Sequence, residues 1–178
     1  MIKYILVFSL FFINGLNGNN NSNQSNPIEL VQNGISITDF KNTFSIGKFI
    51  KEPLNEYGID SENFGLTYLK NGKKIFFIWS RQNNEIISEI IVLDESLSID
   101  GLTVGNTLND FFRTNPNSTI EIDIINSEYE YAKSDNGEYY VEFLIEEQKV
   151  AEYSEDYTLK KIINPNSKID RIRIHRCE

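Results

Sequence analysis

Residues 44–54 read FSIGKFIKEPL, and residues 102–112 read LTVGNTLNDFF. The second segment repeats the first after 58 positions (44 to 102), with apolar, β-branched, glycine, apolar, acidic and apolar residues in the same order. Similar segments at a fixed spacing indicate a repeated structural unit. The matched pairs are Phe44/Leu102, Ile46/Val104, Gly47/Gly105, Ile50/Leu108, Glu52/Asp110 and Leu54/Phe112.

Two further features follow each copy in the same order. The pair Asn-Gly, a strong hairpin signal, stands at residues 71–72 and again at 136–137. The spacing grows from 58 to 65 (71 to 136) and then to 82 (87 to 169), so we expect insertions in the second unit. The larger insertion falls in residues 146–167, which could form a helix or a loop. The last feature is a strand pattern in which Ile87, Ile90 and Val92 match Ile169, Ile172 and Ile174.

The fold class predicted from this order is α+β. Each of the two tandem units is expected to contain a short helix and an antiparallel meander of three or four strands, with the helices packed on one face of the sheet. Gly47 and Gly105 are expected at helix entries, and Gly72 and Gly137 in turns. The segments expected as strands are 34–38, 64–69, 74–79, 85–93, 120–125, 129–132, 139–145 and 169–174, with helices after Gly47 and at 107–113.

This arrangement resembles the β-lactamase-inhibitor-protein-like exported proteins. The resemblance covers residues 44–174 and rests on the motif apolar-Gly-x-x-apolar-x-acid-x-apolar and on the strand order. It implies an antiparallel sheet with short helices on one face, and it identifies no ligand-binding residue. The resemblance also implies an inhibitor function as an expectation.

The N-terminus predicts export. Lys3 precedes an apolar run at residues 5–13, and small residues follow at Gly15 and Gly18, as in a secretory signal peptide. The run is too short for a membrane anchor, which needs about 20 apolar residues. We therefore expect a signal peptide at 1–18, an Asn-rich disordered spacer at 19–26, and one domain at 27–178 made of repeats at about 35–95 and 100–176.

Cysteine usage limits the possibilities further. The single cysteine, Cys177, excludes an intrachain disulfide and a lipid anchor at the cleavage site. It is expected to be a thiol at a frayed end, or else to pair between chains. The expected location is periplasmic or secreted, without a membrane span after cleavage.

The charge distribution is uneven. Residues 121–156 contain 12 acids and two bases, which gives −10, whereas the remainder of the chain after residue 18 balances. Such a surface repels nucleic acid and anionic lipid and attracts a basic partner.

Catalytic and metal-binding patterns are absent from the sequence. One histidine, His175, and one cysteine do not make a zinc site or a nucleophile–histidine pair. The sequence contains no phosphate-binding glycine loop and no EF-hand spacing. Pairs of acids are common here, and a glycosidase would also need one of them buried. We therefore expect no enzymatic activity, no cofactor and no metal.

Six of the nine tyrosines lie at residues 129–157, in and directly after the acidic block. Tyrosine offers a large contact area at low entropic cost and binds cations through its ring. The first hypothesis is a recognition module, inhibitor or adaptor, for a basic protein; the alternative is a structural or accessory envelope protein with no soluble partner. Equally, the rings could cover the core while the acids face Arg171 and Arg173. The predicted contacts are Glu121, Asp123, Glu128, Tyr129, Glu130, Tyr131, Tyr140 and Glu142.

Overall fold

The computed structural model describes residues 27–81, 85–125, 128–146 and 149–176. The predicted signal peptide, the spacer and Cys177 lie outside these ranges. The elements in chain order are α1 (Pro27–Gln32), α2 (Ile37–Thr43), β1 (Lys48–Pro53), the 3-10 helix η1 (Leu54–Tyr57), β2 (Phe64–Lys70), β3 (Lys73–Trp79), β4 (Glu89–Val92), α3 (Leu108–Thr114), β5 (Ile120–Ile122), β6 (Tyr129–Lys133), β7 (Tyr139–Leu144), β8 (Ala151–Tyr153), β9 (Leu159–Ile162) and β10 (Arg171–His175).

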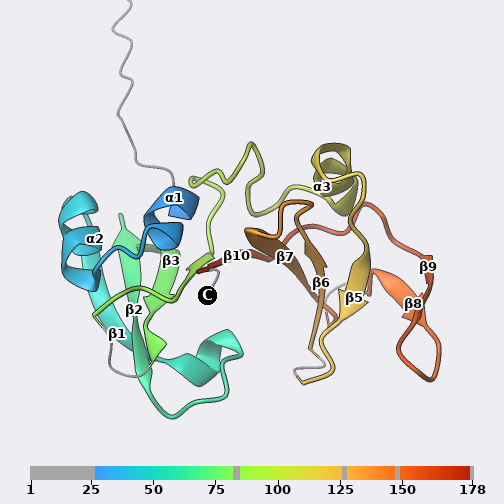
Figure 1. Ribbon diagram of the computed structural model, residues 1–178, viewed down its shortest axis with the longest axis horizontal. Helices are drawn as coiled ribbons and strands as arrows, with labels where there is room; N and C mark the ends of the chain where they lie inside the picture. The colour runs from blue at the N-terminus through green and yellow to red at the C-terminus, as the bar shows by residue number, and fades with distance from the viewer. Residues whose placement is uncertain (1–26, 82–84, 126–127, 147–148, 177–178) are drawn as a thin grey trace, which may run out of the picture.

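Eight of these strands form one antiparallel sheet in the order β1-β2-β3-β4-β10-β7-β6-β5, and β8 and β9 form a separate hairpin. Strand β10 pairs with β4 on one side and with β7 on the other. Figure 1 shows β1–β3 with α1 and α2 in one half of the molecule and β5–β9 with α3 in the other, with β10 between them. The predicted α+β class with a large antiparallel sheet is confirmed.

Successive side chains of each strand point to opposite faces of the sheet. On one face, called here the core face, the ring of Phe76 lies 5.4 Å from the ring of Phe40 in α2. The opposite face is called the second face. It begins with an apolar cluster on β3, where the ring of Tyr57 from η1 stacks on Phe77 at 3.8 Å. Towards β10 and β7 the second face becomes charged, and that region contains the predicted site.

Helices α2 and α3 begin in the same way. Ser36 Oγ accepts a hydrogen bond from the Asp39 N–H at 3.0 Å, and Thr107 Oγ1 accepts one from the Asp110 N–H at 3.2 Å. A capping hydroxyl of this kind satisfies a backbone donor that has no partner inside the helix. The corresponding sequences are GISITDFKNT at 34–43 and GNTLNDFFRT at 105–114, a spacing of 71 (36 to 107).

The 58-residue match is therefore wrong as a structural correspondence. Gly105 stands before helix α3, but Gly47 stands before strand β1, which pairs along its whole length with β2. No room exists for the helix expected after Gly47, because residues 48–53 are used in the sheet. Gly47 itself lies at a close approach of two strands, since an added Cβ would be 2.3 Å from Tyr68 Cε2 and 2.4 Å from the Leu69 carbonyl oxygen.

Most other local predictions are confirmed. Both Asn-Gly pairs lie in hairpin turns, β2–β3 and β6–β7, with φ of +80° at Gly72 and +76° at Gly137. The expected edge strand at 34–38 is wrong, because Ser36 caps α2, and the strand expected at 85–93 shortens to β4. Residues 146–167 contain the β8–β9 hairpin. The remaining expected segments each overlap an observed element, namely β2, β3, α3, β5, β6, β7 and β10.

Candidate functional site

Four of the predicted contacts, on β5, β6 and β7, lie together on the second face. Glu121 and Tyr131 face each other across the β5–β6 ladder, and the Tyr131 hydroxyl donates a hydrogen bond to Glu121 Oε2 at 2.7 Å. Burial and this hydrogen bond raise the pKa of Tyr131 to about 12, so the phenol is protonated at neutral pH. Glu121 remains exposed, which leaves its charge accessible to a partner.

The other two, Tyr129 and Tyr140, are half-buried and extend this surface as an aromatic strip. The guanidinium of Arg171 lies 3.8 Å from the centre of the Tyr129 ring. The ring of Tyr140 lies 5.7 Å from that of Tyr131 and 4.6 Å from the imidazole of His175. Burial raises the pKa of Tyr140. These two rings mainly pack against neighbours in the sheet and form the floor beside the accessible acids.

Glu142 was predicted to contact a partner, and that prediction is wrong. Its Oε1 lies 2.7 Å from Arg173 Nε, its other oxygen pairs with Arg171, and its side chain is almost fully buried. Arg173 Nη1 in turn lies 2.9 Å from Glu89 Oε1, which joins β7, β10 and β4 in one network. Burial raises the pKa of Glu142, although both arginines pull it down. For this residue the alternative hypothesis holds, in which the acids face the two arginines.

Glu130 was also predicted as a contact, and this too is wrong. It lies on the core face of β6 and is fully buried. Its carboxylate accepts hydrogen bonds from the backbone N–H groups of Val150 at 2.6 Å and Ala151 at 2.9 Å. The strand alternation that puts Tyr129 and Tyr131 on the second face sends Glu130 inwards. Its function is to hold the β8–β9 hairpin against β6.

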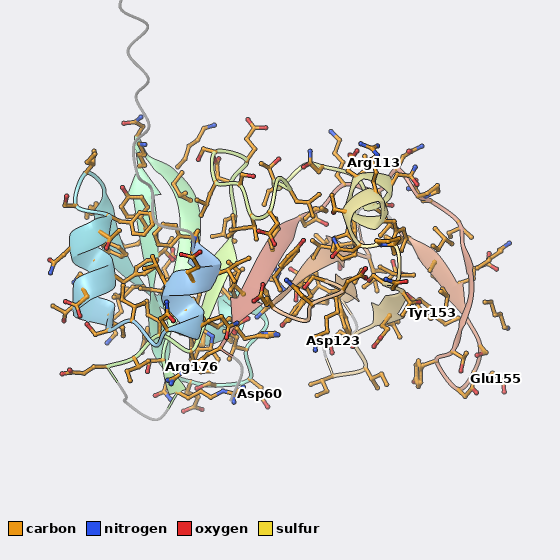
Figure 2. All side chains as sticks on the ribbon, turned by 45° about the horizontal axis from the view of Figure 1, so that its top comes forward. Asp60, Arg113, Asp123, Tyr153, Glu155 and Arg176 are labelled. Carbon is orange, nitrogen blue, oxygen red and sulfur yellow. The ribbon has the colours of Figure 1, made fainter. Side chains whose placement is uncertain are left out.

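The two remaining predicted contacts, Asp123 and Glu128, lie at the ends of β5 and β6. Asp123 is half-exposed, and its Oδ1 accepts a hydrogen bond from the Ile125 N–H at 2.9 Å. Glu128 is exposed. In Figure 2 Asp123 lies in the same half of the molecule as Tyr153 and Glu155, whereas Asp60 and Arg176 lie in the other half. Both acids therefore belong to the accessible negative surface.

A groove of about 590 Å³ runs between β5 with residues 123–125 and the segment 156–159 that leads into β9. Its walls expose unusually large apolar surfaces: Ile125 is 95% exposed, Ile124 66% and Tyr157 54%. Asp123 and Asp156 stand among them. Sequence reasoning missed the apolar part, because Ile124 continued the alternating pattern of a buried strand. The adjacent pair at 124 and 125 was the available signal, since one of two neighbours in a strand must face away from the core.

A polar cluster on the other half of the second face has a structural function. Glu52 accepts hydrogen bonds from Tyr57 and Thr67, and its Oε1 lies 2.8 Å from Lys74 Nζ. Burial raises the pKa of Glu52, but the hydrogen bonds from these groups outweigh it and lower the pKa. Burial raises the pKa of Tyr57. These contacts fasten η1 to β1, β2 and β3.

No group of three or more His, Cys, Asp or Glu residues within the described ranges is placed to hold a metal ion. None of the helices in the same ranges is long and apolar enough to cross a membrane.

Comparison with known proteins bears on the fold and not on the function. No protein-family model matches the chain, and no curated protein shows significant similarity to it. Among solved structures it is similar to the uncharacterized protein yfeY from Escherichia coli, with a TM-score of 0.51 and 14% sequence identity over 82% of this chain and 92% of that chain. At this identity the similarity shows a shared fold alone.

Proposed function

We propose that the protein is a non-enzymatic recognition module, an inhibitor or an adaptor, that binds a basic segment of a partner protein. The observation that carries this proposal is the groove beside β5, where exposed apolar side chains stand next to acids. Ile124, Ile125 and Tyr157 provide apolar area, and Asp123 and Asp156 provide negative charge.

This combination has the composition of an interface. Apolar side chains that are exposed together mark interaction sites, whereas single exposed ones are ordinary. A desolvated apolar centre within a polar rim is the usual anatomy of a protein–protein contact. The surrounding excess of acids attracts a basic partner over distance and repels nucleic acid and anionic lipid. Affinity is expected to come from the apolar centre, and selection for basic partners from the rim.

The proposed contact surface differs from the one predicted from sequence. It keeps Glu121, Asp123, Glu128 and Tyr131, and Tyr129 and Tyr140 support it from within the sheet. Glu130 and Glu142 are excluded by their burial. The residues added to it are Ile124, Ile125, Asp156 and Tyr157.

The test is direct binding to an arginine-rich peptide and to a panel of basic and acidic proteins, in salt from about 50 to about 500 mM. We expect basic ligands to bind and to be released as the salt rises. Ile125→Ser and the double variant Glu121→Gln/Asp123→Asn should weaken binding. The matched control is Asp60→Asn/Glu62→Gln, which removes two exposed acids from the segment between η1 and β2. Equal affinity for all three variants would overturn the proposal.

We also propose that the protein works outside the cytoplasm, in the periplasm or beyond it, after removal of residues 1–18. The support is the pattern of Lys3, the apolar run and the small residues that follow. N-terminal sequencing of the exported protein should find a new end after Gly15 or Gly18. If no soluble partner exists, the accessory envelope function remains, and deletion of residues 19–26 should then disturb it.

The two halves, we further propose, arose by duplication of one unit in which a helix packs on four strands. Support comes from the matching caps at Ser36 and Thr107 and from the mirrored strand orders β1-β2-β3-β4 and β5-β6-β7-β10. A chimera in which residues 107–114 replace residues 36–43 should fold to the same secondary structure by circular dichroism. A chimera that stays unfolded would contradict this origin.

A further inference from the structure

We infer that the partner binds as an additional β-strand on the outer edge of β5, an inference that rests on the proposed function. The added strand is antiparallel and alternates basic and apolar residues. The proposal has three independent supports: the outer edge of β5, which pairs with no strand in the described ranges, the different chemistry of the two sheet faces beside β5, and a strand of the same pattern already inside the fold.

The edge geometry follows from the β5–β6 ladder. The Asp123 N–H donates a hydrogen bond to the Tyr129 carbonyl at 3.0 Å, so the backbone groups of Asp123 point towards β6. In an antiparallel ladder neighbouring residues point their backbone groups to opposite sides. The N–H and C=O of Ile122 therefore point away from β6. Since β5 is the last strand of this sheet, these groups face the groove.

The two faces beside β5 select different side chains. A strand residue opposite Glu121 would carry its side chain on the second face, next to the carboxylates of Glu121 and Asp123. A residue opposite Ile122 would carry its side chain on the core-face side, next to Ile122 and Leu159 in the groove wall. An extended segment satisfies both when basic and apolar residues alternate. Tyr157, on the opposite wall, offers a ring to an arginine.

The fold already contains a strand of this kind. Strand β10 reads Arg171-Ile172-Arg173-Ile174 and lies between β4 and β7. Its arginines pair with Glu142 and Glu89 on the second face, while both isoleucines are buried in the core. The same sheet therefore accepts alternating basic and apolar residues beside acids, and β5 presents an acid on that same face.

The opposite edge of the sheet is unsuited to such a segment. Strand β1 carries Lys48 and Lys51, and Pro53 at its end. Lysine and proline are common protections of an edge strand against further pairing. A basic segment would be repelled at β1 and attracted at β5, so the charge selects one edge of the two.

The test uses a short labelled peptide of alternating arginine and valine, with fluorescence anisotropy as the readout. In an antiparallel added strand the valines lie opposite Ile122, so their N–H groups face β5. Methylation of the valine nitrogens should therefore reduce affinity at least about tenfold, the loss of one strand hydrogen bond. Methylation of the backbone nitrogens of the arginines should leave affinity within about twofold, because their N–H groups face away from β5.

Two variants of Ile122 provide the matched test on the protein side. Ile122→Pro removes the outward N–H, and proline is tolerated on an edge strand when its nitrogen faces solvent. Ile122→Ala removes the side chain and keeps the N–H. We expect the proline variant to lose most binding and the alanine variant to lose less. Circular dichroism should show that both variants are folded.

The outcomes separate the two proposals. Binding that is unaffected by Ile122→Pro and by either methylation overturns the added strand, while the proposed function survives. No binding of basic peptides or proteins at low salt overturns both. If the protein self-associates in sedimentation and Ile122→Pro abolishes this, the groove belongs to a second copy and the inference of a separate partner is overturned.

Discussion

The buried carboxylate of Glu130 accepts a hydrogen bond from the backbone N–H of Ala151 at 2.9 Å, across 21 positions of sequence. Its second oxygen accepts one from the neighbouring Val150 N–H. A carboxylate that receives backbone donors inside a protein makes stronger hydrogen bonds than a neutral acceptor. These bonds set the position of the β8–β9 hairpin, whose turn and first β9 residue form the groove wall at 156–159.

Replacing Glu130 by Gln should loosen this hairpin. Glutamine has one acceptor oxygen, so one of the two backbone donors would lose its partner and face an amide N–H instead. We expect a loss of about 1–3 kcal/mol in the free energy of unfolding. The amide protons of Val150 and Ala151 should exchange faster in hydrogen-exchange measurements. Glu128→Gln, an exposed change two positions away, should leave exchange at both sites as it is.

Breaking the ion-pair network at the centre of the second face should be costly. Arg173→Met leaves two buried carboxylates, Glu89 and Glu142, with less compensation. Removal of one member of a buried pair costs about 3–5 kcal/mol. As the control, Lys161→Met breaks the exposed pair with Glu152, which should cost less than about 1 kcal/mol. Urea unfolding of both variants measures the difference, and similar midpoints would contradict the importance of the network.

His175 should titrate below its ordinary range. Burial lowers its pKa, Glu89 opposes this, and nearby positive charges reinforce it. Since the unfolded chain then binds the proton more tightly, stability should fall as the pH drops from about 6.5 through the folded-state pKa. His175→Gln should reduce that fall. The chain has one histidine, so a single imidazole signal in NMR reports the pKa, and a value above 6.5 would contradict the expectation. The nearby positive groups are Lys133, Arg173 and Arg81.

Two glycines should respond differently to alanine. Gly47→Ala places a methyl group 2.4 Å from the Leu69 carbonyl oxygen, so the backbone must shift. At Gly72 an added Cβ meets nothing within 4 Å, and the cost is the φ of +80° alone. We expect about 1–2 kcal/mol for Gly72→Ala and more for Gly47→Ala. Thermal unfolding gives the order of the two, and the reverse order would show that β1 and β2 approach less closely than described.

The sequence predicted the strands more accurately than the helices. Asn-Gly turns and alternating isoleucines are local signals with a period of two residues, and they located both hairpins and β10. Helix α2 was missed because GISIT alternates like a strand, although the Ser36–Asp39 cap competes with that pattern. The segments 34–43 and 105–114 share Gly, Asp, Phe and Thr at matched positions, whereas 44–54 and 102–112 share only the glycine. The capping pattern Ser/Thr-x-x-Asp, and not the glycine, marks the equivalent positions.

The predicted contact residues differ in burial, and the spacing of residues along the sequence does not reveal burial. Glu121 and Glu142 both lie on the second face, but the first is at the edge and the second is beside Arg173 in the centre. Strand alternation alone places Glu130 on the core face. Its backbone donors at 150 and 151 could not be anticipated, because buried carboxylates are rare. Position within the sheet order, fixed only by long-range pairing, decided which acids reach the surface.

Strand β10 completes the sheet, and its pairing joins segments far apart in the chain, as in the contact of Arg173 with Glu89 over 84 positions. During synthesis β4 is made long before β10, its neighbour in the sheet, emerges. Its exposed edge would meanwhile offer the apolar residues Ile90, Ile91 and Val92 to other unfinished chains. The two halves are thus joined late, and the folding rate should be governed by the arrival of residues 171–175 between β4 and β7.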